Sequence, residues 1–245
     1  MNADAPMVKP DGLRRMTLDP SIALTRFGLG ARPAEIGWVR TDPAGWLEHQ
    51  ITTDGAPQPQ ITATTAQRLT ELRTYQRQQR EAKQAGDPKN DQIKMLAKLL
   101  RDDAAADFLA RFQLGATTDR GFAERWALFW ANHFTVSATK GVTASLIGPF
   151  EQEAIRPHVF GRFEDMLVAS SQHPAMLIYL DQAQSIGPDS FAAERARRNP
   201  RARPPGLNEN LAREIMELHS VGVEAGYSQA DVTEFARAMT GWSTG

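Results

Sequence analysis

The sequence predicts an all-α protein, an irregular bundle of about ten helices that includes a long polar helical hairpin. Apolar residues recur at helical spacing in most of the chain, whereas the alternation that is typical of strands never continues over about six residues. Several segments also begin with a polar residue followed by proline, which is a signal for a helix start. Residues 1–17 are predicted to be a flexible lead-in, and 18–245 a single helical domain.

Three helix starts share the polar-proline signal, at Asp19-Pro20, Asp42-Pro43 and His173-Pro174. The polar residue caps the helix, and proline suits the first helical position because its missing N–H would have no partner there. After the first of these helices comes Gly28-Leu29-Gly30. A phosphate loop would need a strand before it, so we interpret this segment as a helix stop.

The polar hairpin is predicted from residues 63–86 and 91–114, with Gly86-Asp87-Pro88 as the break between them. The first of these helices has few apolar residues beyond Leu69, Leu72 and Tyr75. We therefore expect its end to extend into solvent or to contact a partner.

The helix predicted for 119–134 carries Phe122, Trp126, Phe129 and His133 on one stripe, which we expect to face the core. His133 has two interpretations. It is either a buried, hydrogen-bonded core histidine, or a ligand or base at a cleft, because apolar surroundings would lower its pKa and keep it neutral.

Residues 174–181 predict a deeply buried helix that ends at Asp181. A carboxylate at a helix C-terminus is unfavourable, because it faces the negative end of the helix dipole. We expect Arg156, Arg213 or a bound cation to compensate for it. The next segment, 182–206, is predicted to be a basic loop rich in arginine and proline. It is interpreted as solvated, with contacts to phosphates or an acidic partner as the alternative.

The densest group of polar side chains lies in two predicted helices, 207–222 and 228–242. Leu207, Leu211, Ile215 and Leu218 are expected to be buried on the first of them. Its polar face carries Glu209, Arg213 and Glu217 four residues apart, as a ladder of alternating charge. Asn208 is expected to cap this helix, and Ser228 with Asp231 to form a capping box on the next.

The same region resembles a known family. NENLAREIMELHSVG and YSQADVTEFARAMTGW are similar to the bacterial family known as domain of unknown function 1800, as are ALTRFGLGARPAE, ERWALFWANHF and HPAMLIYLDQAQSIGP upstream. The resemblance implies a helical protein with no established activity. It also implies that this chain corresponds to the N-terminal half of a longer protein, whose C-terminal half would be a partner for it.

Composition limits the classes of function. The chain has 245 residues, 41% hydrophobic and 23% charged, with a net charge of −1, so nucleic-acid binding driven by overall charge is not expected. No cysteine occurs, which excludes disulfides and cysteine-ligated zinc. A membrane span and a signal peptide are not predicted either. We expect a cytoplasmic protein and leave export of a full-length form open.

Two functions fit the sequence. The first is a scaffold or partner-binding module. The alternative is a metal- or carboxylate-dependent hydrolase or oxidoreductase with a site formed by the helices 119–134, 174–181, 207–222 and 228–242; its cofactor is unknown, and a divalent metal is one candidate. The candidate catalytic residues are His133, Asp181, Glu214, Glu217 and Asp231, with Asn208, Asn210, Arg213 and Arg237 as candidate binding residues.

Overall fold

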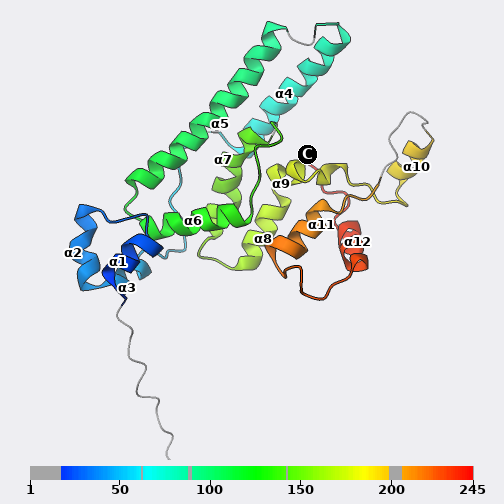
Figure 1. Cartoon of the computed structure of the whole chain (residues 1–245). Helices are drawn as coiled ribbons and strands as arrows, with labels where there is room; N and C mark the ends of the chain where they lie inside the picture. Colours follow the sequence, from blue (N-terminus) through cyan, green and yellow to red (C-terminus); the bar gives the residue numbers. More distant parts are fainter. Residues whose placement is uncertain (1–17, 62, 88–89, 142, 199–205, 245) are drawn as a thin grey trace, which may run out of the picture.

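The computed structural model describes residues 18–61, 63–87, 90–141, 143–198 and 206–244. These residues form helices and no strand, which confirms the all-α prediction (Figure 1). The helices are α1 (Pro20–Ile22), α2 (Pro33–Thr41), α3 (Pro43–Glu48), α4 (Thr65–Gln84), α5 (Asp91–Thr117), α6 (Gly121–His133), α7 (Ile147–Phe150), α8 (Phe163–Gln172), α9 (Pro174–Tyr179), α10 (Phe191–Arg197), α11 (Asn210–Glu214) and α12 (Gln229–Ala238). The predicted flexible segment 1–17 lies outside the described residues.

Shorter turns extend several of these helices. Three are π-helical: η1 (Ala23–Phe27), η3 (Glu151–Ile155) and η6 (Ile215–His219). Three are 3₁₀ turns: η2 (Ala144–Leu146), η4 (Arg156–His158) and η5 (Gln182–Gln184). The segment 182–206 is therefore not entirely a loop, because it contains η5 and α10. Among the helices of the described residues, none is long and apolar enough to cross a membrane.

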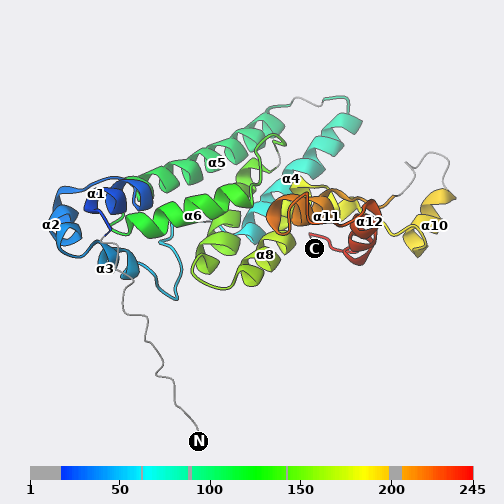
Figure 2. The same cartoon turned by 60° about the horizontal axis from the view of Figure 1, so that its bottom comes forward.

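Helices α4 and α5 form the predicted long hairpin, and its tip extends away from the rest of the chain in both views (Figures 1 and 2). Helix α6 runs below α5, with α1, α2 and α3 at one end. Helices α11 and α12 lie at the other end, near α9. The first and last helices are thus separated by the central layer of α5, α6 and α7.

The predicted polar-proline helix starts are confirmed. Asp19 accepts a hydrogen bond from the Ser21 backbone N–H at 2.7 Å, and Asp42 accepts one from Gly45 at 2.9 Å. His173 caps α9, because its Nδ1 accepts from the Ala175 N–H at 3.1 Å. Since Nδ1 is the acceptor, the ring proton of neutral His173 lies on Nε2.

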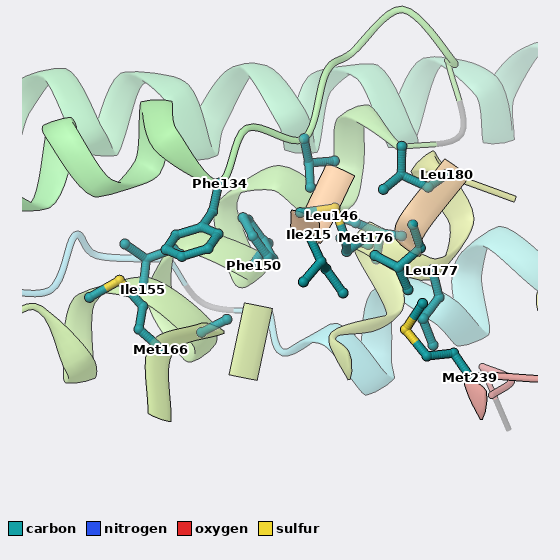
Figure 3. Packing of buried hydrophobic residues seen from close by; sticks show 14 of the residues in the cluster. Phe134, Leu146, Phe150, Ile155, Met166, Met176, Leu177, Leu180, Ile215 and Met239 are labelled. Atoms are coloured by element: carbon teal, nitrogen blue, oxygen red, sulfur yellow. The ribbon is translucent and has the colours of Figure 1, made fainter. Parts of the chain in front are cut away.

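The main core joins the central and C-terminal helices (Figure 3). Its buried members include Phe134, Phe150, Ile155, Met176 and Leu211. A second, smaller cluster of Ala23, Leu24, Val39 and Trp46 packs with Phe122 at the N-terminal end. Helix α6 therefore contributes side chains to both clusters and joins them.

The predicted core stripe of α6 is wrong for Phe129, whose exposed fraction is 51%. The buried face of α6 consists of Gly121, Ala123, Glu124 and Ala127. Small residues allow the backbone of α6 to approach its neighbours closely, and the large rings lie along the edge of this contact. The prediction failed because Glu124 pairs with a buried arginine and so faces the core. A pattern of apolar residues cannot reveal such a buried charge.

The predicted stripe of residues 207–222 is also only partly correct. Leu211 and Ile215 are buried, but the exposed fraction of Leu218 is 61%. The chain makes a π-helical turn over Ile215–His219, and such a turn holds more residues than an α-helical one. One turn after Ile215, the buried residue is therefore His219 instead of Leu218.

Candidate functional site

Four of the five predicted catalytic candidates, all except Glu214, have local partners, and Asp181 is the clearest example. Its carboxylate lies 2.6 Å from Lys140 Nζ, which also donates to the Tyr179 carbonyl oxygen at 2.7 Å. The prediction that Arg156 or Arg213 pairs with Asp181 is therefore wrong, because its partner is Lys140. The ammonium group of Lys140 neutralises the carboxylate at the end of α9 and satisfies a terminal carbonyl group of the helix.

Asn208 connects the end of α9 to the start of α11. Its amide nitrogen donates to the carbonyl oxygens of Leu180 at 3.0 Å and Asp181 at 2.9 Å. Its Oδ1 accepts from the Asn210 N–H at 2.9 Å, but the N-cap position of α11 is Glu209, so the predicted cap at Asn208 is one residue too early. The Asn210 side chain donates weakly to the same Leu180 carbonyl, at 3.5 Å. Both asparagines thus satisfy main-chain groups.

The Glu209, Arg213 and Glu217 ladder joins α11 to α12. Arg213 Nη1 lies 2.7 Å from Glu217, and its Nη2 lies 3.3 Å from Glu209. Glu209 also accepts hydrogen bonds from Thr233 and Gln229, both at 2.8 Å. These two hydrogen bonds are the main reason why the pKa of Glu209 is lowered.

The remaining candidates are distributed around this ladder. Burial raises the pKa of Glu214, and the nearby charge of Glu217 adds to this effect. Asp231 accepts from the Ser228 N–H at 2.7 Å, which confirms the capping box. Arg237 pairs with exposed Glu234 at 3.3 Å. Within the described part of the chain, no three histidine, cysteine, aspartate or glutamate side chains are placed to hold one metal ion.

His133 lies at the end of α6 beside a second histidine. Its Nε2 is 3.1 Å from the carbonyl oxygen of His219, and a carbonyl only accepts, so Nε2 carries the proton. The His219 ring is buried, and its Nδ1 has no hydrogen-bond partner among the described residues. Burial, together with the nearby charge of His133, lowers the pKa of His219 to about 4. His219 is therefore neutral at pH 7.

Aromatic rings surround this pair of histidines. Phe129 stacks on Trp126 with ring centroids 5.0 Å apart and also contacts Trp130 and His133. The ring of Phe163, at the start of α8, also lies near His133, with ring centroids 6.5 Å apart. We call Trp126, Phe129, Trp130, His133 and Phe163 the aromatic surface. The exposed fraction is 51% for Phe129 and 40% for Phe163, so their rings face solvent.

A short apolar segment adjoins the aromatic surface. Leu218 lies in the π-helical turn and Val221 and Val223 follow it; their exposed fractions are 61%, 59% and 69%. The hydrogen bond between His133 and the His219 carbonyl holds the start of this segment against α6. His133 of the aromatic surface thus contacts the chain at the start of this segment, although 86 positions separate His133 from His219.

Two buried ionic networks were missed by the sequence analysis. In the first, Arg156 binds Glu124 and Glu151, and Arg111 also pairs with Glu151 at 3.1 Å. In the second, Arg68 pairs with Glu71, Asp103 and Asp107. The only local signal is a charged residue on an otherwise apolar helix face, as at Glu124 in α6. The partners come from other helices, so spacing along the chain cannot identify them.

The family model described as "Protein of unknown function (DUF1800)" matches residues 22–245. The chain belongs to this family. The match confirms the resemblance seen in the sequence, and both the aromatic surface and the buried networks of this DUF1800 chain lie within it. No curated protein and no solved structure shows significant similarity to the chain.

Proposed function

We propose that this chain is a partner-binding module and that the aromatic surface binds an apolar segment of another polypeptide. The observation that carries the proposal is the exposure of contiguous rings on α6 and α8 next to Leu218, Val221 and Val223. Soluble proteins rarely expose large contiguous apolar areas, and those that exist often mark interaction sites.

The composition of the aromatic surface supports a protein partner. The centres of protein interfaces are enriched in aromatic side chains and depleted of charge, and tryptophan is common among the residues that dominate binding energy. Trp126 and Trp130 stand edge to face, 5.4 Å apart. They are partly buried and flanked by the more exposed Phe129, which is the arrangement expected of a preformed contact area.

The neutral state of His219 and the aliphatic side chains near it support an apolar partner. His219 is neutral at pH 7 because its pKa is about 4. Leu218 and Val221, close to it in the chain, are exposed aliphatic side chains, and exposed Ser220 and Glu224 belong to the same segment. We infer that the contacting face of the partner is apolar, like one face of an amphipathic helix.

The enzyme alternative has less support. Asp181, Glu217 and Asp231 are engaged by Lys140, Arg213 and the Ser228 backbone N–H, respectively. Each of these contacts stabilises a helix end or a helix pair. A reaction at these carboxylates would therefore require them to leave their structural partners.

The test is site-specific photocrosslinking in cells of the source organism, with benzoylphenylalanine at position 129 or 163. We expect both positions to give the same adduct of defined mass, identified by mass spectrometry. Position 191 is the control, because Phe191 is 80% exposed but belongs to α10. The adduct should not form there.

The identified partner is then purified and its affinity for the chain is measured. Phe129→Ala should weaken binding by about tenfold or more, as expected for a residue that dominates an interface, whereas Phe191→Ala should have no effect. Sedimentation of the chain alone is measured in parallel. A homodimer that is lost in Phe129→Ala, or an identical adduct from position 191, would contradict a partner of different sequence at this surface.

A further inference from the structure

A cavity of about 450 Å³ lies between α5, η2, α7 and the segment before α4. Its wall is largely apolar and includes Ile61, Ala104, Phe108, Ala144 and Ile147. The size is within the range of sites for small organic molecules. None of the lining residues belongs to the aromatic surface, so this cavity is separate from the proposed partner site.

One carboxylate oxygen in this apolar wall lacks a hydrogen-bond partner among the described residues. Asp107 lines the cavity with an exposed fraction of only 7%, and its Oδ2 has no hydrogen-bond partner among the described residues. The other oxygen, Oδ1, makes a long contact of 3.5 Å to Arg68. Leaving a buried carboxylate oxygen unpaired is costly, which favours a ligand that donates to it.

Gly148 shows that the chain leaves room for this carboxylate. A Cβ added at Gly148 would lie 2.7 Å from Asp107 Oδ2 and 2.8 Å from Asp107 Cβ. Both residues line the same cavity. The absence of a side chain at position 148 is therefore what allows Oδ2 to occupy its place at the cavity wall.

The charges around the cavity are unbalanced at Asp107. Arg68 is shared by Glu71, Asp103 and Asp107, so one guanidinium faces three carboxylates. In the neighbouring network, Arg111 and Arg156 balance Glu124 and Glu151. Burial raises the pKa of Asp107 despite the opposing charge of Arg68, and Asp103 raises it further. A cation bound at Asp107 would relieve this excess of negative charge.

We propose that this cavity is a binding site for a small organic cation, an ammonium group with an apolar alkyl or arylalkyl body. The ammonium group donates to Asp107 Oδ2, and the body contacts the apolar wall beside Phe108 and Ile147. A metal ion fits less well, because calcium needs six to eight oxygen ligands and this wall is mostly hydrocarbon. An organic anion would meet Asp107 directly. Arg111 also lines the cavity, but its Nε lies 3.1 Å from Glu151, which balances its charge although this contact lacks hydrogen-bond geometry.

The test is titration calorimetry of the full chain at neutral pH with phenethylammonium, hexylammonium, phenethyl alcohol and phenylacetate. The alcohol has the shape of phenethylammonium without its charge. We expect phenethylammonium to bind about tenfold more tightly than the alcohol, because hydrogen bonds to charged groups are the stronger ones, and phenylacetate to bind more weakly than either.

Two substitutions separate the charge of Asp107 from the charge of its surroundings. Asp107→Asn should make the affinities for phenethylammonium and phenethyl alcohol equal within about threefold. Asp103→Asn is the matched control: it removes a carboxylate from the same arginine, but Asp103 does not line the cavity. It should retain the preference for the ammonium ligand. Circular dichroism and the melting temperature verify that each variant folds.

A third variant tests the location without altering Asp107. Ala104→Leu adds three carbon atoms at the cavity wall and should weaken the binding of phenethylammonium and of phenethyl alcohol to the same extent. The proposal is overturned if neither ammonium probe binds, if phenylacetate binds most tightly, or if Asp107→Asn keeps the preference. Equal loss of that preference in Asp103→Asn would overturn it as well.

Discussion

Arg156 and Glu124 form a two-point ion pair in which neither side chain is exposed to solvent. Arg156 Nη1 lies 2.7 Å from Glu124 Oε2, and Nη2 lies 2.9 Å from Oε1. Arg156 also donates to Glu151 and to the Pro57 carbonyl oxygen. A single guanidinium thus joins α6, η3 and the segment before α4. Burial alone would lower the pKa of Arg156, but Glu124 and Glu151 outweigh it and the pKa is raised.

Glu124→Ala should lower the free energy of unfolding by about 3–5 kcal/mol, because it leaves a buried guanidinium without its main partner. Glu217→Ala is the control. It breaks the Arg213 pair, in which the arginine side chain is 41% exposed, and should cost at most about 1 kcal/mol. Urea denaturation of both variants measures the difference. Similar losses would show that the Arg156 network contributes no more than a surface ion pair.

Asp181 has a left-handed backbone conformation, with φ of 57°. Asp181→Gly and Asp181→Ala both remove the ion pair with Lys140, but only glycine adopts this conformation without steric cost. The glycine variant should therefore be more stable than the alanine variant by about 1 kcal/mol. Thermal denaturation of the two variants provides the comparison. An alanine variant that is as stable as glycine would mean that the backbone relaxes to negative φ.

Stability should fall as the pH is lowered from about 6.5 to about 4, in the range where His219 titrates. The pKa of His219 is about 4 in the folded chain and about 6.5 in an unfolded one. Between these two pKa values the unfolded state binds a proton that the folded state does not bind, so a lower pH favours unfolding. The contribution of this residue is at most about 3 kcal/mol and is fully present above pH 6.5.

His219→Asn isolates this contribution in urea denaturation at a series of pH values. The variant should lose part of the slope of stability against pH between pH 4 and 6.5, whereas His49→Asn, at an exposed position, should keep it. His173→Asn should also reduce the slope, because burial lowers the pKa of His173 as well. An unchanged slope in His219→Asn would mean that this ring is already accessible to protons in the folded chain.

Local signals in the sequence predicted helix boundaries well. The caps at Asp42 and His173 and the capping box of Ser228 and Asp231 were recognisable because each depends on residues at most three positions apart. The hairpin was recognisable from its polar composition and from the break after Gly86. What periodicity could not predict was which side of α6 faces the core. Its buried face is defined by small residues and by Glu124, and its large rings suggested a different face.

For the candidate site, the sequence predicted contacts within one helix but not contacts between distant segments. Glu209, Arg213 and Glu217 form the expected ladder, because four-residue spacing on one helix brings them together. The partner of Asp181 could not be found this way, since Lys140 is 41 positions away in a loop. The same applies to Asp107 and Arg68, which are 39 positions apart on the two helices of the hairpin. The roles of the candidate catalytic residues stay a prediction.

Gly55 lies against the backbone of the residue that organises the buried network. Its φ is +78°, and an added Cβ would be 2.2 Å from the Arg156 carbonyl oxygen and 2.8 Å from Pro157 Cα. The same carbonyl accepts the Ala56 N–H at 2.9 Å, so it has little freedom to move. Gly55→Ala thus introduces both backbone strain and a collision with main-chain atoms.

We expect Gly55→Ala to lower the free energy of unfolding by about 3 kcal/mol or more, a loss typical of strain combined with a steric clash. Gly86→Ala is the matched control: its φ is +81°, and no atom of the described residues lies within 4 Å of an added Cβ. Only the conformational cost of about 1 kcal/mol applies there. Urea denaturation of the two variants separates the clash from the strain. Equal losses would show that the 52–57 segment can move away from Arg156 without breaking the buried ion pairs.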